Sequence, residues 1–521
     1  MLTYDVRFIA GFYPLLLIAF WFGGRNHPGR AVAILLIASA VFYALADPIH
    51  APLIFSLVLI NFALAVWLTR AGEAGARRWV GAGVAFNAAV LAYYKYGAGG
   101  PVAGASPAAA LIQAGLPLGL SFFILKQISW LVDIRSDRKT PMGSNDLPRF
   151  ALYSIFFPQM IAGPIYRYRD AAEDYASLGR DKLELSALAV GLSVFILGLA
   201  KKVLLADPIG TAANAVFEAV AAGHSPGVLE AWTGAWAYML QLYFDFSGIS
   251  DMALGIGLTF GLKLPINFFS PFKARNGSEF FDRWHISLVV FVRTYVFSPI
   301  VRRVRRSVSG SGAERTIKAT AIATFVSLSL VGWWHGAKAT FVFSGMAAGL
   351  ASVILQLVAF RRATSGPSRP RRGSRKGWGR VMLIAAVLVF GVLFRAADLS
   401  TAAAILGGMA GLSGDPAGTA LLPPLGSLGG LDAVFHLSSP VPGGALLVCL
   451  IATGIAFLGP NTVEIFNLYD HPGAPQRAPA NRLAVTPVLR VQWALACGLL
   501  LAISLMRVID GDLQGTIYAR F

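Results

Sequence analysis

The chain has 521 residues, of which 56% are hydrophobic and only 13% are charged. A soluble protein carries about 25% charged residues, and apolar runs recur along most of this chain, so a soluble enzyme with a single anchor is excluded. The formal net charge of +18 does not indicate nucleic-acid binding, because the basic residues lie in loops between apolar runs. In that position they favour a positive-inside topology and contact with the lipid bilayer.

The apolar runs predict an all-α, polytopic membrane protein. A full crossing needs about 20 apolar residues, and several runs are shorter or are interrupted by Gly and Pro. We therefore expect re-entrant or partial helices among them, buried where protein can satisfy the backbone. The candidate spans are 8–22, 31–46, 51–69, 80–94, 111–134, 150–165, 187–205, 229–244, 248–262, 285–300, 318–334, 338–360, 381–395, 444–459 and 489–507.

The first apolar run, 8–22, is predicted to be a membrane span and not a cleaved signal peptide. Asp5 precedes it, Arg7 is the only basic residue ahead of it, and no small-residue cleavage site follows it. Arg25 and Arg30 should hold its far end in the cytoplasm. The N-terminus is therefore expected on the outside.

Two aspartates lie in a glycine-rich apolar stretch. Asp245 and Asp251 are six positions apart, and Ser247-Gly248 is expected to interrupt the helix between them. A buried carboxylate needs a cation or backbone N–H groups. We favour a structural role, in which each carboxylate caps a broken helix or pairs with a nearby arginine, over a direct role in chemistry.

The next stretch, 273–285, mixes aromatic and charged side chains and ends in Arg283-Trp284-His285. This pattern fits a helix lying on the membrane surface, with His285 as a simple interfacial anchor. The second histidine downstream, His335, favours instead a site that the two histidines share.

His335 follows Trp334 near the middle of the apolar stretch 321–360, whose only formal charge is Lys338. This stretch is long enough for two spans of about 20 residues. A polar ring in hydrocarbon needs a partner or a task, so an intramembrane histidine is a functional hypothesis by default. The alternative is a core histidine whose hydrogen bonds are satisfied.

The two loops richest in arginine, 302–306 and 361–380, are predicted to be cytoplasmic. Counting spans from the second loop places the segment 413–443, which has no Lys or Arg, on the outside. The same count places the C-terminal tail with Tyr518 outside. Both termini are therefore predicted to be extracytoplasmic.

Several other classes of protein lack support. Cys449 and Cys497 lie in apolar spans, as buried free thiols do. No CxxC or HExxH spacing suggests a metal, and no phosphate-binding loop suggests an ATP-driven pump. No internal repeat suggests an inverted-repeat transporter. We expect no metal and no bound cofactor.

The polar residues stand in strings with a distinctive spacing. A Trp-His-Gly string follows about 50 residues after Arg-Trp-His-Ile-Ser-Leu, and Phe-Asp-Phe-Ser-Gly precedes both. Trp-His-Gly alone is weak evidence, whereas this order and spacing are very specific. The strings are 94–96, 116–122, 131–133, 156–159, 162–165, 198–202, 244–248, 250–253, 283–288, 334–336 and 394–396.

From about residue 87 to the C-terminus these strings resemble the membrane-bound O-acyltransferases. The likeness is to the bacterial branch that includes the alginate O-acetyltransferase membrane subunit. The resemblance implies a single membrane domain over 1–521, with tilted helices in a ring around a thin centre and funnels from both faces. It also implies residues for the site: His335 and His285 as the catalytic pair, with Trp334, Asp245, Asp251, Arg283 and Trp284 as supporting pocket residues.

The implied reaction moves an acyl group from a cytoplasmic donor, acetyl-CoA, toward a hydroxyl presented from outside. In an apolar environment His335 should be neutral near pH 7 and can act as the general base. His285 could orient the donor or stabilise the oxyanion. The protein is expected in the bacterial plasma membrane.

Four positions depart from the branch pattern. Asp282 precedes Arg283 where a second basic residue is usual, and Thr294 replaces an aspartate between Arg and Tyr. Lys126 stands where glutamine is usual, and 302–306 replaces a glycine-containing turn. These departures put the donor and the substrate in doubt, not the class of reaction.

The tail resembles an aromatic-x-Tyr-x-x-Phe pattern of the branch, although Thr516 replaces the first aromatic residue. The hypothesis is that Tyr518 accepts the acyl group as a phenolic ester and presents it to an extracytoplasmic acetyltransferase partner. The alternative is a Tyr/Phe belt at the membrane interface, or a frayed chain end.

Three functions remain open at this point. The first is O-acetylation of an exopolysaccharide or other cell-envelope glycan, directly or through the partner. The second is D-alanyl or other acyl transfer to teichoic acid or a lipid acceptor, with a carrier protein as donor. The third is a transporter or channel whose histidines do no chemistry.

Overall fold

In a computed structural model of the chain, the structure describes residues 1–97, 115–136, 143–180, 185–364, 376–412, 442–473, 491–510 and 515. The predicted all-α fold is confirmed. Helices joined by turns make up these residues, which contain no strand beyond one isolated bridge between Phe268 and Trp284. Internal contacts divide the chain into two compact units, and α12 (Val228–Thr259) begins in the second unit and ends in the first.

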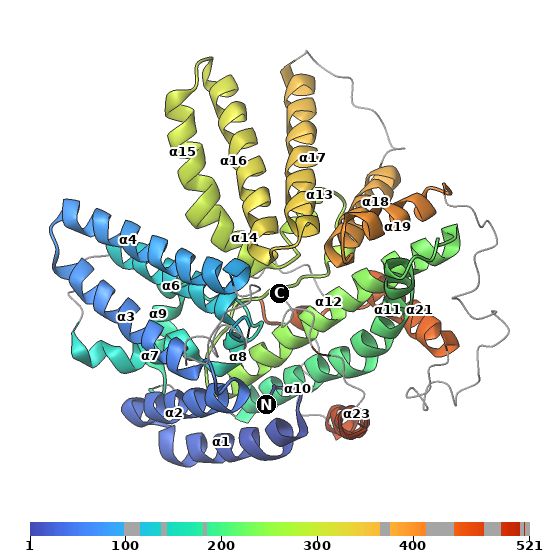
Figure 1. Cartoon of the computed structure of the whole chain (residues 1–521). Helices are drawn as coiled ribbons and strands as arrows, with labels where there is room; N and C mark the ends of the chain where they lie inside the picture. The colour runs from blue at the N-terminus through green and yellow to red at the C-terminus, as the bar shows by residue number, and fades with distance from the viewer. Residues whose placement is uncertain are drawn as a thin grey trace, which may run out of the picture. The chain divides into compact units, whose positions relative to one another are not determined.

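Unit 1 comprises Met1–Lys201, Phe246–Asn267 and Asn461–Arg520. Within it α3, α4 and α6 pack against one another, and α10 packs against α23 (Figure 1). Its helices are η1 (Phe8–Phe12), α1 (Tyr13–Ala19), η2 (Phe20–Gly24), α2 (Pro28–Ala46), α3 (Ala51–Arg70), α4 (Glu73–Ala92), η3 (Tyr93–Gly97), α6 (Leu120–Ser136), η4 (Ser144–Asp146), α7 (Leu147–Ile155), α8 (Phe157–Met160), α9 (Tyr168–Ser177), α10 (Leu185–Ala200), α22 (Thr462–Phe466) and α23 (Val491–Ile509).

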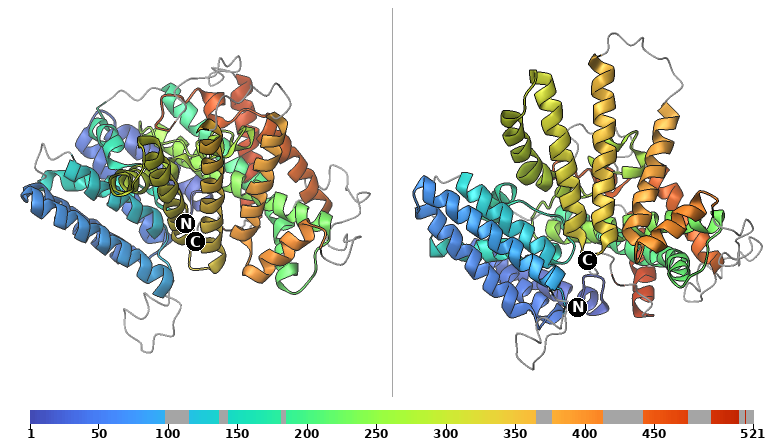
Figure 2. Two further views of the ribbon diagram at one scale, coloured as in Figure 1. Left: turned by 90° about the horizontal axis from the view of Figure 1, so that it is seen from above. Right: turned by 45° about the horizontal axis from the view of Figure 1, so that its top comes forward.

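Unit 2 comprises Lys202–Asp245, Phe268–Pro460 and Phe521. Here α16 packs against α17 on one side and α15 on the other, as the views of Figure 2 also show. The π-helix η5 (Lys201–Ala206) joins unit 1 to it. Its other helices are α11 (Asp207–Ala221), η6 (Pro271–Lys273), α13 (Gly277–Phe281), α14 (Ile286–Val292), η7 (Arg293–Phe297), α15 (Ser298–Ser307), α16 (Gly312–His335), α17 (Ala339–Thr364), α18 (Lys376–Arg395), α19 (Leu399–Met409) and α21 (Pro442–Leu458).

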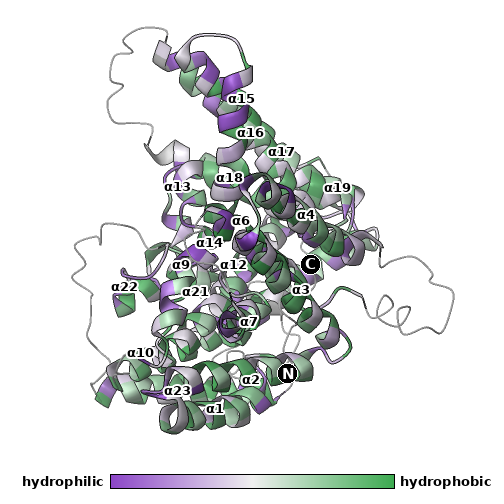
Figure 3. Ribbon diagram, turned by 90° about the vertical axis from the view of Figure 1, so that its left-hand side faces the viewer, coloured by the Kyte–Doolittle hydropathy of each residue, from purple (hydrophilic) through white to green (hydrophobic). Residues whose placement is uncertain are grey.

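Long apolar helices with exposed apolar side chains identify a membrane protein. Ile37 in α2, Leu355 in α17 and Leu495 in α23 are 64%, 69% and 68% exposed, and the hydrophobic colouring of Figure 3 runs along α16 and α17. Such side chains are stable where lipid tails cover them. Among the described residues, six helices are long and apolar enough to cross a membrane: Pro28–Ala46, Ala51–Arg70, Leu185–Ala221, Gly312–His335, Ala339–Arg362 and Val491–Ile509.

Two predictions about helix boundaries are wrong. The spans predicted at 229–244 and 248–262 form the single helix α12, and Ser247-Gly248 does not interrupt it. The physical reason is close packing of α10 against the α12 backbone at this point: a Cβ placed on Gly198 of α10 would lie 2.6 Å from the Gly248 carbonyl oxygen and 2.6 Å from the Met252 nitrogen. The stretch predicted as one surface helix, 273–285, forms only the short η6 and α13, because Asn276 interrupts it with an extended backbone and caps α13.

The crossing of α10 with the second half of α12 admits only glycine at two further positions. A Cβ on Gly255 would lie 2.4 Å from the Gly191 carbonyl oxygen and 2.5 Å from the Phe195 nitrogen. Small residues allow such an approach between membrane helices. The packing of unit 1 therefore depends on Gly191 and Gly255.

We expect Gly255→Ala to destabilise the protein by about 1–3 kcal/mol, the usual cost of overpacking. The control is Gly498→Ala in α23, where an added Cβ meets nothing within 4 Å and the better helix propensity of alanine favours folding by about 1 kcal/mol. Thermal unfolding in detergent measures both. Equal unfolding midpoints for the two variants would contradict the close crossing.

Candidate active site

His335 is the last residue of α16 and stands at the turn between two helices that can cross the membrane. Gly336 follows with an extended backbone (φ 169°, ψ 174°) that ends α16, and α17 begins at Ala339. Gly332 and Gly345 hold the two helices close, because a Cβ on Gly345 would lie 2.9 Å from the Gly332 Cα atom. The turn that carries His335 is thus fixed at the connected end of a tight helix pair (Figure 1).

Aromatic rings enclose the His335 imidazole, which is 8% exposed. The Trp334 and Phe394 rings each lie 4.8 Å away between centroids, at 64° and 82° to the imidazole plane. Phe341 lies at 6.5 Å, and a Cβ on Gly336 would meet the Phe341 ring at 2.8 Å. The imidazole is therefore enclosed by aromatic side chains and largely shielded from solvent.

Arg283 holds a turn that is tied to the preceding segment. Phe268 and Trp284 form the isolated bridge, and the Phe269 N–H donates to the Arg283 carbonyl oxygen at 3.0 Å. The Arg283 guanidinium donates to the Phe269 carbonyl oxygen at 3.2 Å and to Glu279 at 2.8 Å. These bonds give Arg283 a structural role in positioning the residues that follow it.

Trp284 and His285 are fixed by packing and by an unusual backbone. The Trp284 ring stacks on Phe280 at 5.5 Å and lies 6.3 Å from Tyr243. His285 adopts the left-handed conformation (φ 46°, ψ 50°) just before α14 begins at Ile286, a conformation that is rare for residues other than glycine. Burial lowers the pKa of His285 to about 3, so its ring is neutral at pH 7.

Asp245 forms a buried ion pair with Lys202, with Nζ and Oδ1 3.0 Å apart. The same ammonium group also pairs with Asp207. The three side chains are 1%, 1% and 4% exposed for Lys202, Asp245 and Asp207. Asp245 therefore pairs with a cation, as its predicted structural role requires. That cation is a lysine, whereas we predicted an arginine.

Asp251 has a parallel arrangement within unit 1. Lys201 lies 2.5 Å from its Oδ2 atom, and the Thr462 hydroxyl donates to the same oxygen at 2.6 Å. Lys201 also donates to the Thr462 oxygen at 2.8 Å. Two consecutive lysines of η5 thus neutralise the two aspartates of α12.

Two residues of this arrangement were not among the predicted site residues. Phe394 belongs to one of the sequence strings, and no pattern places its ring against His335. Lys202 was not singled out because it stands at the end of an apolar run. A lysine pair close to a buried aspartate is a sequence signal that could have identified it as a buried cation. Unit 2 contains six of the predicted site residues: His335, His285, Trp334, Trp284, Arg283 and Asp245. Asp251 belongs to unit 1, and Tyr518 lies outside the described residues.

A family model matches residues 85–395, more than half of the chain and a stretch that includes both histidines. The model is that of MBOAT, the membrane-bound O-acyltransferase family. The chain belongs to this family. The MBOAT resemblance inferred from the sequence strings is thereby confirmed, and the protein is an O-acyltransferase of the membrane.

Several proteins with assigned names are similar in sequence to this MBOAT chain. A protein named "Probable alginate O-acetylase" of Pseudomonas putida is 33% identical over 417 residues, which cover 77% of this chain and 79% of the relative. The peptidoglycan O-acetyltransferase of Helicobacter pylori is 32% identical over 73% of this chain and 74% of its own length. The teichoic acid D-alanyltransferase of Streptococcus thermophilus is 29% identical over 49% of this chain and 60% of its own length.

Proposed function

We propose that this MBOAT protein transfers an acetyl group from cytoplasmic acetyl-CoA toward a hydroxyl group of an exopolysaccharide or other cell-envelope glycan, in the bacterial plasma membrane. The observation that carries the proposal is the enclosed imidazole of His335 at the connected end of α16 and α17. The names of the two relatives at 33% and 32% identity support acetyl groups and envelope glycans.

In the proposed step His335 is the general base. Its neutral imidazole takes the proton of the acceptor hydroxyl while the hydroxyl oxygen attacks the thioester carbonyl carbon. The new C–O bond forms, the C–S bond breaks, and the CoA sulfur leaves as a thiolate that receives the proton from the imidazolium. The rings around His335 keep water from competing with the acceptor hydroxyl.

His285 has a different part in this proposal. Because its ring is neutral at pH 7, it contributes a hydrogen bond and not a positive charge. A fixed N–H donor stabilises the oxyanion that develops on the thioester carbonyl. The left-handed backbone and the packing of Trp284 keep that donor in one position.

The proposed acyl path continues to the C-terminal tail. With both termini outside, as the distribution of Lys and Arg favours, Tyr518 carries the acetyl group as a phenolic ester. An extracytoplasmic acetyltransferase partner then moves it to the glycan. Each transfer exchanges one ester for another and needs no further reactant.

We expect acetyl-Tyr518 in protein supplied with acetyl-CoA without its partner, and no glycan acetylation by Tyr518→Phe. Peptide mass spectrometry of the tail and an assay of glycan acetate measure the two results. The control is Tyr93→Phe, a change of the same kind at a tyrosine that is 49% exposed and lies outside the tail. Glycan acetylation without detectable acetyl-Tyr518, or by Tyr518→Phe, would overturn the relay but leave the donor reaction standing.

The second candidate function is D-alanyl transfer, which the teichoic acid D-alanyltransferase at 29% identity supports. Purified protein given labelled acetyl-CoA, or a carrier protein loaded with labelled D-alanine, distinguishes the two donors. Label transfer from acetyl-CoA alone supports the proposal. Transfer from the carrier protein alone would replace it with D-alanylation.

A further inference from the structure

Positive charge gathers at the end of α16 that lies farthest from His335. Between Ser298 and His335 the chain has six basic residues and a single acid, Glu314. The six basic side chains are all exposed: Arg302, Arg303, Arg305 and Arg306 in α15, and Arg315 and Lys318 in the first turns of α16. Together with the exposed Arg362 near the end of α17, they form what we call the cationic tip.

The four arginines of α15 lie on one side of that helix. At 3.6 residues per turn they span an arc of about 160°. The apolar residues Ile300, Val301 and Val304 occupy the rest of the helix and are partly buried, and α15 packs against α16. Figure 3 shows the resulting hydrophilic colouring on α15. The packing of α15 therefore turns its arginines away from the protein.

The end of α17 brings a further cation to the same level. The turn after His335 joins α16 to α17, and the two helices pack against each other. The Gln356 amide of α17 donates to the Thr324 hydroxyl of α16 at 3.0 Å. Arg362 and Lys318 each lie six residues beyond this bond, toward the same end of the helix pair. Arg362 therefore stands level with Lys318.

No carboxylate among the described residues forms an ion pair with the basic residues of α15 or with Arg315, Lys318 and Arg362. Glu314 accepts the Ser311 N–H at 2.8 Å as part of a capping box. Lys318 donates to the Ser309 carbonyl oxygen at 3.1 Å, which does not neutralise its charge. In the sequence, the segment 365–375 that follows α17 adds four arginines and no acid. The charge of the cationic tip is therefore not balanced locally.

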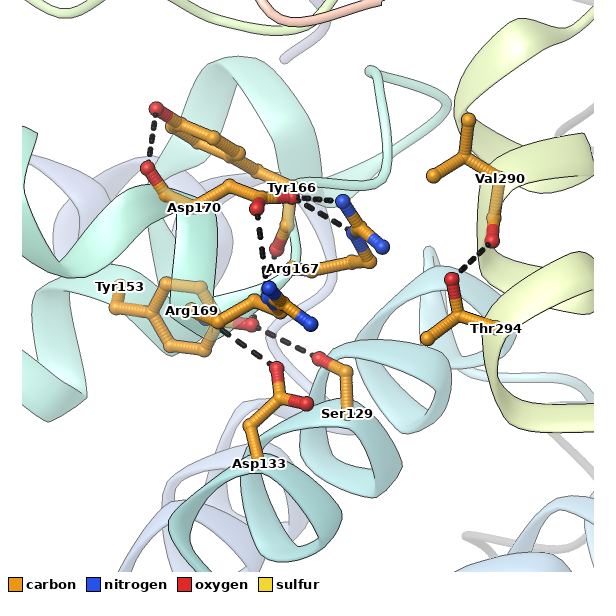
Figure 4. Close-up of polar contacts among 9 residues, drawn as sticks. All are labelled: Ser129, Asp133, Tyr153, Tyr166, Arg167, Arg169, Asp170, Val290 and Thr294. Atoms are coloured by element: carbon orange, nitrogen blue, oxygen red, sulfur yellow. Dashed lines mark hydrogen bonds and ion pairs between the residues drawn. The ribbon is translucent and has the colours of Figure 1, made fainter. Parts of the chain in front are cut away.

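Arginines elsewhere in the protein do meet carboxylates. In unit 2, Arg293 lies 3.0 Å from Asp282, although both side chains are more than half exposed. In unit 1, Arg167 lies 2.5 Å from Asp170, and Arg169 also turns toward Asp170 (Figure 4). The cationic tip differs from these arginines, because the anion that would balance it has to come from outside the chain.

The position of the cationic tip along α16 favours lipid phosphates as that anion. Ile322, Val326 and Leu330 are exposed and repeat every four residues, the spacing of one helix face. In a membrane, lipid tails cover such a face. Lys318 precedes Ile322 by four residues, which is about 6 Å along a helix. Since the headgroup layer on each side of a bilayer is about 5–8 Å thick, the cations begin at the level of the phosphates.

We propose that the cationic tip binds the headgroups of anionic phospholipids such as phosphatidylglycerol. The positive-inside rule predicts a cytoplasmic position for it, where anionic lipids make the membrane surface negative. Guanidinium groups bind phosphate oxygens in bidentate pairs, so a row of arginines on one side of α15 suits several headgroups. Zwitterionic lipids carry an ammonium group that offsets the phosphate. This lipid site goes beyond the proposed acyl transfer and does not depend on it.

Native mass spectrometry of the full chain in detergent tests the proposal. The protein is titrated with phosphatidylglycerol or with phosphatidylcholine of the same acyl chains, and the unchanged protein should bind phosphatidylglycerol more tightly. Each basic residue near an anionic surface contributes a factor of about five, so loss of all four α15 arginines should weaken phosphatidylglycerol binding about tenfold or more. Phosphatidylcholine binding should not change. The variant combines Arg302→Gln, Arg303→Gln, Arg305→Gln and Arg306→Gln.

Two further variants are matched controls. Arg→Lys changes at the same four positions keep the charge and lose only the bidentate fork, so they should bind phosphatidylglycerol within about fivefold of the unchanged protein. Arg275→Gln combined with Arg293→Gln removes two exposed arginines that already pair with carboxylates, and its lipid binding should stay within about twofold. Its counterpart with the same number of changes, Arg302→Gln combined with Arg306→Gln, should show a loss between those of the unchanged protein and the four-arginine variant.

Hydrogen exchange of the full chain in phosphatidylcholine nanodiscs, with and without phosphatidylglycerol, locates the bound lipid. Phosphatidylglycerol should slow exchange within 302–318 of the unchanged protein but not of the four-arginine variant. Equal affinity of the unchanged protein for the two lipids would overturn the proposal, as would undiminished phosphatidylglycerol binding by the four-arginine variant. Undiminished lipid binding with loss of acyl transfer in that variant would also overturn it and favour an acidic soluble partner. Neither measurement uses acyl transfer, so failure of the donor reaction leaves the lipid site standing.

Discussion

Replacing His335 with alanine is expected to lower acyl transfer by about 10²–10⁴-fold, the usual contribution of a general base. The imidazole contacts Trp334 and Phe394 at the connected end of α16 and α17, so its removal deletes the proton acceptor without breaking the helix pair. Transfer of labelled acetyl from acetyl-CoA to the acceptor measures the loss. Donor binding by equilibrium dialysis should stay within about twofold.

A matched change at the exposed His27 provides the control, and His27→Ala should retain full activity. Loss of activity together with loss of donor binding would assign His335 to folding or binding instead of proton transfer. Normal acetylation by His335→Ala with an altered flux of donor across the membrane would favour the transporter hypothesis. It would contradict the mechanism in which His335 is the general base.

Replacing Lys202 with methionine is expected to destabilise the protein by about 3–5 kcal/mol, because it leaves buried charge without its cation. Lys202 is 1% exposed and pairs with both Asp207 and Asp245. Methionine has a similar length, so the change removes charge with little change of volume. Thermal unfolding in detergent and the yield of folded protein measure the effect.

The same region offers a rescue and a matched control. Lys202→Met combined with Asp207→Asn and Asp245→Asn removes all three charges and should recover most of the lost stability. Lys263 pairs with Asp470 on the surface, where the side chains are 50% and 60% exposed, so Lys263→Met should cost less than about 1 kcal/mol. Equal losses for Lys202→Met and Lys263→Met would contradict the assigned role of the buried pair.

The sequence predicts the parts of this molecule that depend on local pattern. The apolar runs predict the helices, and the cost of a polar ring in hydrocarbon is enough to single out His335 within its apolar stretch. The strings around His285 and His335 predict the family, which the family model confirms. These predictions need no knowledge of which helices pack together.

The rest depends on contacts between distant positions. Ser247-Gly248 reads as a break because glycine weakens an isolated helix, yet α10 packs against that glycine and α12 continues. Similarly, Lys201, Asp251 and Thr462 are far apart in the chain but form one hydrogen-bonded group. The lysine pair near Asp207 marks Lys201 and Lys202 as candidate partners, but no local pattern tells which aspartate of α12 each lysine meets.

The position of His335 at the very end of α16 has an electrostatic consequence. The peptide dipoles of a helix add up to a partial negative charge at its C-terminal end, where the last carbonyl groups have no partner within the helix. Such an end stabilises a cation by about 0.3–1 kcal/mol, and by up to about 2 kcal/mol when it is partly buried. The 24 residues of α16 therefore do more than carry the base: their backbone attracts the proton that the proposed reaction puts on His335 and helps to hold it until the leaving group takes it.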